Sequence, residues 1–170
     1  MTQAIKMTIE DQDDCQRTMR RIHQLLDCGI FKPANHQHIL MQSAFIDLMI
    51  CMRDLLHKTA KYAQRVSFDD DILKNDYVND VTDAVTAIRD ACCHINSFKQ
   101  HFDVPQHRGS FMVVNGAGAL LQINDFRLSS DYKDDIAFFY GKNRLYFHRH
   151  IMRAFEEAVT KLEPMLDKIP

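Results

Sequence analysis

The scarcity of chain-breaking residues is the feature that most limits how this chain can fold. Its 170 residues include only five glycines and four prolines. Because glycine and proline are the strongest local breakers of regular structure, long uninterrupted elements are expected. Three of the five glycines, at positions 116, 118 and 141, lie in one late region, so the remainder is nearly unbroken. The sequence therefore favours helices.

Four stretches carry apolar residues at the three- and four-residue spacing of a helix, at about 9–30, 36–66, 77–97 and 149–169. Thr8 can cap the first, and Glu10 and Asp11 follow it at the positive end of the helix dipole. The early part of the second stretch is apolar around much of its circumference. It is therefore expected to lie at the centre of the fold.

The third stretch has a narrow apolar seam, which consists of Val81, Val85, Ile88, Cys92 and Ile95. The spacing alternates between four and three residues, as in a coiled coil. A strip of small residues runs beside the seam: Ala84, Ala87 and Ala91. Because small side chains let another helix approach closely, we expect a helix of a second copy to pack here.

The pattern changes between the third and fourth stretches, where short β-leaning runs replace the helical spacing. Runs at 111–115 and 120–124 are joined by 116–118, and runs at 135–140 and 143–148 are joined by 141–142. They predict two small hairpins. We therefore expect a mainly α fold, a helical bundle with a small antiparallel β-hairpin insert at about 111–148 before the last helix. The length predicts one domain over residues 1–170.

Composition excludes several classes of protein. Hydrophobic residues make up 46% of the chain and charged residues 26%, which excludes a disordered or collagen-like protein. A net charge of −2 excludes a wholly basic nucleic-acid binder. The N-terminal residues lack the apolar core of a signal peptide, and the five cysteines include no Cys-x-x-Cys pair. We expect a cytoplasmic protein with reduced thiols.

The most informative motif closes the third predicted helix and reads Arg89-Asp90-Ala91-Cys92-Cys93-His94. At about 100° per residue, Asp90 and His94 share one face, so the carboxylate can orient the imidazole. Arg89 lies about 140° from His94 and is not expected to reach it on the same helix. The two could meet across a two-fold axis, where each copy presents its patch to the other.

An arginine, a histidine and an acidic residue suit cleavage of RNA without a metal. Histidine can move protons at the 2′-hydroxyl and at the leaving oxygen, and a guanidinium can bind the phosphate and stabilise its developing charge. The alternative is structural, with Arg89 and Asp90 as surface charges and His94 as a cation at the negative end of the helix dipole. A similar stretch, Arg53-Asp54-Leu55-Leu56-His57, is one residue shorter. An ion-pair or capping role is expected there.

The motif Arg89-Asp90-x-x-x-His94 resembles the signature of the HEPN superfamily, an Arg-x4-6-His pattern with a polar residue directly after the arginine. The resemblance implies an HEPN-like helical domain that acts as a homodimeric, metal-independent endoribonuclease, often in a defence or toxin–antitoxin system. It implies that Arg89 binds the phosphate, Asp90 orients the site and His94 transfers protons. The chain departs from some toxin-type members because no tyrosine follows the histidine, and the β insert lies outside the minimal family core.

A second group of basic residues surrounds the last predicted strand and the start of the final helix: Lys142, Arg144, His148, Arg149, His150 and Arg153. Such a group is typical of an RNA-backbone contact and equally of a solvated surface. The aromatic residues among these predicted strands are expected to lie in the core rather than to stack on bases.

The expected partners are an RNA substrate, a second copy of the chain and an antitoxin or other protein, with no membrane, metal or cofactor. No histidine or cysteine pair has the spacing of a structural zinc site with a matching partner pair. Two further functions stay open. One is a non-catalytic helical dimer that binds a protein or a nucleotide, and the other is a metal hydrolase built on Asp69, Asp70 and Asp71.

Overall fold

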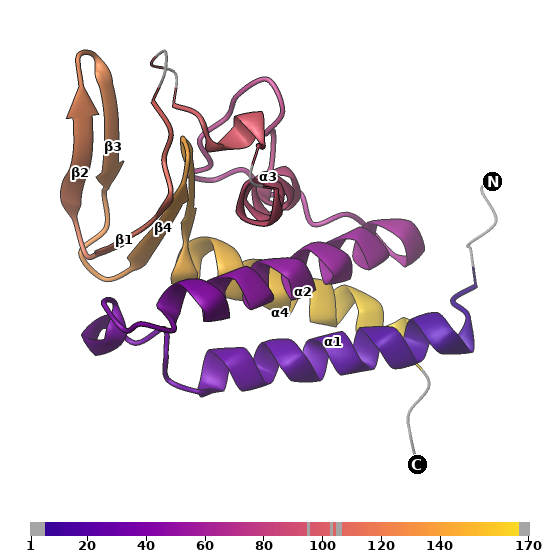
Figure 1. Ribbon diagram of the computed structural model, residues 1–170. Helices are drawn as coiled ribbons and strands as arrows, with labels where there is room; N and C mark the ends of the chain where they lie inside the picture. The colour runs from indigo at the N-terminus through magenta and orange to yellow at the C-terminus, as the bar shows by residue number, and fades with distance from the viewer. Residues whose placement is uncertain (1–5, 95, 103, 105–106, 167–170) are drawn as a thin grey trace.

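The computed structural model describes residues 6–94, 96–102, 104 and 107–166. Helices α1, α2 and α4 lie side by side, and α3 crosses them and is seen end-on in Figure 1. The strands form a separate layer at one end of the helices, and the β2–β3 hairpin is the outermost part of that layer (Figure 1). In the described part of the chain, no helix has the length and apolar character needed to cross a membrane.

The first two helices agree with the predicted pattern apart from their ends. Helix α1 spans Ile9–Asp27, and the Thr8 hydroxyl caps it by accepting from the backbone N–H of Asp11 at 3.1 Å. This confirms the predicted cap. Helix α2 spans Met41–Tyr62 and buries one broad face. It contacts α1, α3 and α4, as expected of a central helix.

Helix α3 spans Val81–Cys93 and is shorter than predicted at both ends. It begins at Asp80, whose carboxylate accepts from the backbone N–H of Asp83 at 2.9 Å. Aspartate is a preferred N-cap because it satisfies one of the free N–H groups of the first turn. The predicted seam residue Ile95 lies outside the described residues.

The final predicted helix is divided into three parts. A π-helical segment, Phe147–Met152, leads into α4, Arg153–Leu162, and a short 3₁₀ turn follows at Glu163–Met165. The turn contains Pro164, which cannot supply the N–H that a continuing helix needs. The predicted end at residue 169 lies outside the described residues.

In the described part of the chain, five strands replace the two hairpins that were predicted. The order β1–β4–β5 forms an antiparallel sheet from Phe111–Asn115, Ile136–Tyr140 and Asn143–Tyr146. The hairpin of β4 and β5 is confirmed, but the predicted pairing of 111–115 with 120–124 is wrong. Strand β2, Gly118–Ile123, instead pairs with β3, Phe126–Ser130, a strand that was not predicted.

Strand β4 is buried on both faces and divides the hydrophobic interior into two clusters. Ile136, Phe138 and Tyr140 face the helices, and the Phe138 ring lies 4.6 Å from the Phe45 ring of α2. Ala137 and Phe139 face the opposite way and pack in a smaller cluster with the β2–β3 hairpin. The sheet is therefore a middle layer between helices and hairpin.

The fold is thus mixed α/β, and the predicted mainly helical bundle with a β insert is wrong. Half of the structure is helical and 18% is strand. The physical reason is that the sheet supplies one wall of the main core instead of lying on the surface of a finished helical bundle. A short apolar run such as β4 carries no alternation, so its burial on both faces cannot be read from the sequence.

Candidate active site

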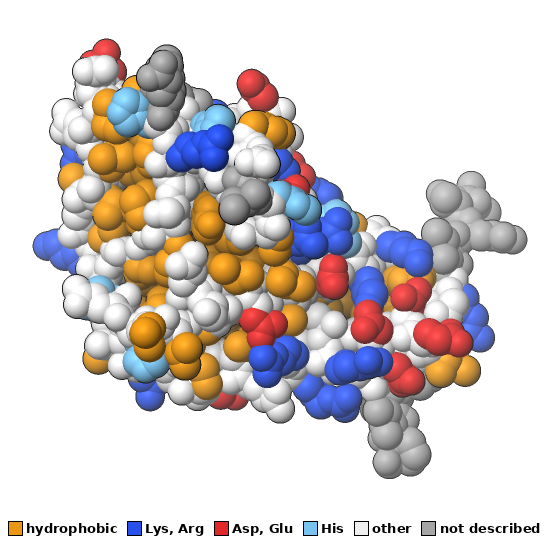
Figure 2. All heavy atoms as spheres, in the orientation of Figure 1, with side chains coloured by type: hydrophobic (Ala, Val, Ile, Leu, Met, Phe, Trp, Pro, Cys, Tyr) orange, Lys and Arg blue, Asp and Glu red, His pale blue; other side chains and the backbone are white. Residues whose placement is uncertain are grey.

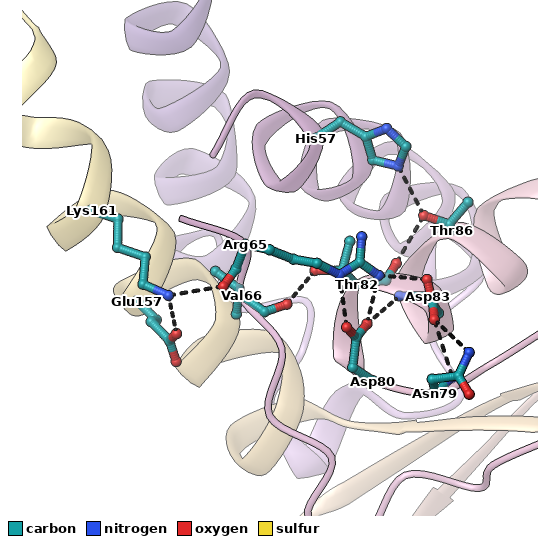
Figure 3. A network of polar contacts seen from close by, with 10 residues as sticks. All are labelled: His57, Arg65, Val66, Asn79, Asp80, Thr82, Asp83, Thr86, Glu157 and Lys161. Atoms are coloured by element: carbon teal, nitrogen blue, oxygen red, sulfur yellow. Dashed lines mark hydrogen bonds and ion pairs between the residues drawn. The ribbon is translucent and has the colours of Figure 1, made fainter. Parts of the chain in front are cut away.

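Helix α3 is fixed against the end of α2 by a network of polar contacts that Figure 3 shows. The Arg65 guanidinium binds both carboxylate oxygens of Asp80, at 2.8 and 2.9 Å, and contacts Asp83 at 2.5 Å. The hydroxyl of Thr82 donates to the carbonyl of Val66 at 2.6 Å. Because Asp80 also caps α3, this network sets the position of the whole helix and of the motif at its end.

The structure brings Arg89 and His94 together within one chain. The Arg89 Nη1 atom lies 3.5 Å from His94 Nε2. The helix ends at Cys93, and His94 has extended backbone angles, φ −121° and ψ 106°. The separation of about 140° expected from helix geometry is therefore wrong, because His94 is no longer part of the helix.

A glutamine side chain stabilises this end of α3. The Gln100 amide donates to the carbonyl of Ala91 at 2.8 Å and to that of His94 at 3.0 Å. The last carbonyls of a helix have no partners inside the helix, so a side chain that satisfies them fixes where the helix stops. The loop after α3 thus holds the turn that directs His94 toward Arg89.

Asp90 lies between two cations and does not contact His94 through its side chain. Lys99 Nζ contacts one carboxylate oxygen at 2.6 Å, and Arg89 Nη1 contacts the other at 3.3 Å. Burial alone would raise the pKa of Asp90, but the hydrogen bond and charge of Lys99, together with Arg89, hold this pKa below its ordinary value. Asp90 is therefore an anion that orients Arg89, and Lys99 is a member of the site that sequence reasoning missed.

The second Arg–His stretch, on α2, lies beside the motif. His57 Nε2 is 3.2 Å from the hydroxyl oxygen of Thr86, which precedes Arg89 by one helical turn. Arg53 contacts Asp54 at 3.3 Å, as the expected ion pair requires. Figure 2 shows cationic side chains beside histidines on this face, over α3 and the second half of α2. An ion-pair or capping role was predicted for this stretch, and the stretch also places His57 next to α3.

The strip of alanines on α3 is not available to a second copy. Ala84, Ala87 and Ala91 are all buried within the chain's own core. The small side chains of α3 let α2 and the sheet of the same chain pack closely against it. The close contact that was predicted for a helix of a second copy is therefore made by elements of the same chain. Hence neither the alanine strip nor the Arg89–His94 pair supplies a geometric reason for a dimer.

The predicted RNA-contacting residues form a network of internal ion pairs. Arg144 has a side chain only 7% exposed and binds Asp131 at 2.8 Å. Arg149 binds Asp134 and Asp135, each at 3.1 Å. These partners neutralise the arginines and tie the β3–β4 connection to β5 and to the segment that follows it.

The remaining members of that group differ in their surroundings. His150 is 1% exposed, and it cannot touch RNA in this conformation. Arg153 binds Asp70 at 2.9 Å, and His148 is exposed. The Lys142 ammonium lies 5.7 Å from the centre of the Tyr77 ring. The structure therefore does not gather the six residues into one free basic surface.

The three consecutive aspartates have three different partners. Lys74 binds Asp69, Arg153 binds Asp70, and the Tyr132 hydroxyl donates to Asp71 at 2.6 Å. Within the described residues, no three histidine, cysteine or acidic side chains gather as a metal site would require. This arrangement holds the segment between α2 and α3 against the sheet and the start of α4.

Comparisons with protein-family models, with curated proteins and with solved structures found no match to this chain.

Proposed function

We propose that this protein is a metal-independent endoribonuclease whose site is the Arg89–Asp90–His94 cluster at the end of α3. The observation that carries the proposal is the 3.5 Å approach of Arg89 Nη1 to His94 Nε2. A guanidinium can bind a phosphodiester and stabilise the charge that develops on it. A histidine in contact with that guanidinium lies where a bound phosphate would present its reacting oxygens.

The chemistry needs only groups that the chain supplies. A base removes the proton of the 2′-hydroxyl, the 2′-oxygen bonds to phosphorus, and the bond to the 5′-oxygen breaks as that oxygen gains a proton. The products are a 2′,3′-cyclic phosphate and a 5′-hydroxyl. Arg89 holds the phosphate, Asp90 fixes Arg89 and His94 transfers a proton. The proposal depends on the contacts among Arg89, Asp90 and His94 and does not require a helical-bundle fold.

The test is cleavage of short single-stranded RNA in the presence of a chelator. Arg89→Ala and His94→Ala should each lower the rate by at least about 10²-fold, because each removes a group that acts on the transition state. Arg21→Ala is a matched control, since Arg21 is an exposed arginine paired with Asp47 on another face of α2. Unchanged rates in both site variants would contradict the proposal, and RNA binding without cleavage would favour the non-catalytic module.

The homodimer, an antitoxin partner, the cytoplasmic location and a role in defence stay predictions. The HEPN resemblance also stays a prediction, which now depends on the motif alone. A dimer is tested by the molar mass in solution, measured by light scattering. Because Arg89 and His94 meet within one chain, the proposed activity does not require the second copy.

A further inference from the structure

His57 lies on the last turns of α2 and faces α3 next to the proposed site. His57 is partly exposed, and its Nε2 lies 3.2 Å from the hydroxyl oxygen of Thr86. Thr86 precedes Arg89 and Asp90 by three and four residues, so these side chains follow one another along the same side of α3. Figure 3 shows the ring held at Thr86 by one nitrogen, with the other nitrogen pointing away from it.

The contacts of Thr86 determine which nitrogen of His57 carries the proton. The Thr86 hydroxyl donates its only proton to the carbonyl of Thr82 at 2.8 Å. It can therefore only accept from His57, and His57 Nε2 must be the donor. In the neutral ring, Nδ1 then carries a free lone pair. This is the atom that faces away from Thr86, and it can accept a proton from a substrate.

The electrostatic surroundings keep His57 in the neutral form. Partial burial lowers its pKa, and the positive charges of Arg53 and Arg65 lower it further. Asp54 and Asp90 act in the opposite direction but do not outweigh these effects. A histidine that is neutral near pH 7, has a fixed tautomer and an available Nδ1 meets the requirements of a general base.

Resting on the proposed function, we infer that His57 is a second catalytic residue, the base that removes the proton from the 2′-hydroxyl. Its Nδ1 takes that proton as the 2′-oxygen attacks phosphorus. His94 transfers a proton to the departing 5′-oxygen. Cleavage of this kind needs both an acid and a base, and the motif on α3 contains only one histidine. The ligand is thus a phosphodiester with a free 2′-hydroxyl, held between α2 and α3.

The two histidines can be distinguished by the leaving group of the substrate. RNA leaves with a poor 5′-alkoxide that must be protonated, whereas uridine 3′-(4-nitrophenyl phosphate) releases a stable phenolate that needs no acid. His57→Gln should lose about 10²–10⁴-fold in rate on both substrates, because the base is needed for each. His94→Ala should show a comparable loss on RNA and a much smaller loss on the nitrophenyl ester.

Two control variants separate proton transfer from positioning. Thr86→Ser keeps the acceptor for His57 and should retain activity, whereas Thr86→Val removes the acceptor and should lower the rate less than His57→Gln does. The rate of the wild type should fall at low pH as His57 becomes protonated, and His57→Gln should lack that fall. All four variants are checked for native circular dichroism.

Each outcome decides the inference. If Arg89→Ala and His94→Ala lose activity while His57→Gln keeps it, the second base is refuted and the proposed function stands. If His57→Gln loses activity only on RNA, then His57 would be the acid, and the assigned role is refuted. If the wild type cleaves neither substrate, both the proposed function and this inference are refuted.

Discussion

His150 provides a quantitative prediction about the stability of the fold. Its ring is buried, Nε2 lies 2.9 Å from the carbonyl oxygen of Asp70, and Nδ1 accepts from the backbone N–H of Tyr146 at 3.1 Å. Both ring nitrogens are thus satisfied in the neutral form, because Nε2 donates and Nδ1 accepts. If Nδ1 were protonated, its N–H would face the backbone N–H of Tyr146, and two donors would then oppose each other in the interior.

Burial is the largest cause that lowers the pKa of His150, from 6.5 to about 4, and Arg144 also lowers it. Asp71 and Asp135 and the bond to Asp70 act in the opposite direction. The unfolded state therefore binds the proton more tightly than the folded state does. The contribution of His150 to stability is complete above pH 6.5 and is lost as the pH falls toward about 4.

The size of this loss follows from the two pKa values. A tenfold difference in proton affinity is worth about 1.4 kcal/mol, so between pH 7 and pH 5 His150 should remove about 2 kcal/mol from the free energy of unfolding. The assay is urea unfolding at both pH values for the wild type and for His150→Gln, whose side chain does not titrate. The variant is less stable at pH 7, and the difference between the two proteins should shrink by that amount at pH 5.

A titration of the His150 ring by nuclear magnetic resonance measures the same quantity directly. We expect a pKa near 4 for this residue. An equal pH dependence of wild type and variant, or a His150 pKa close to 6.5, would show that the neutral, doubly bonded ring does not describe the folded protein.

Three further predictions concern the glycines, the thiols and the core. Gly141→Ala should cost at least about 1 kcal/mol in urea unfolding, because φ is +57° and a Cβ would overlap backbone of the facing loop, whereas Gly118→Ala should be nearly neutral. Equal stabilities of the two variants would contradict this. Iodoacetamide should modify exposed Cys93 in the native protein but spare Cys92, since burial raises the pKa of Cys92 to about 12. Labelling is measured by mass spectrometry, and equal labelling of the two thiols would refute this prediction. Phe138→Ala should lower the free energy of unfolding by about 3–5 kcal/mol through lost packing against α2, and a loss below about 1 kcal/mol would mean that β4 is not the wall of the core.

The helices and one hairpin were predictable because their signals are local. The Thr8 cap, the apolar spacing of α1 and α2, and the Gly141–Lys142 turn each lie within a few residues of the element that they specify. The pairing of β1 with β4 joins residues about 25 positions apart in the chain. No residue pattern within β1 indicates which strand pairs with it, so the sequence favoured pairing with the next run along the chain. Strand β3 was missed because its five residues, FRLSS, carry few β-forming side chains.

The candidate site was predicted in composition but not in geometry. Arg89, Asp90 and His94 were found from their spacing, yet the spacing assumed a helix that continues through His94. The contact that ends the helix comes from Gln100, in a loop where the sequence pattern gives no information. His57 carried a visible signal, an Arg–His pair of similar spacing on another helix, but its contact with Thr86 depends on how the helices pack.

The proposed site requires that Arg89 and His94 act together within a single chain. Mixing the Arg89→Ala and His94→Ala variants shows whether they do, with the RNA cleavage rate of the wild type as the reference. We predict that the wild type cleaves and that the mixture is as inactive as either variant alone. If the site were shared between two copies, random pairing would restore about a quarter of the wild-type rate. That recovery would contradict a site formed within one chain, and a wild type that does not cleave RNA would contradict the proposed function.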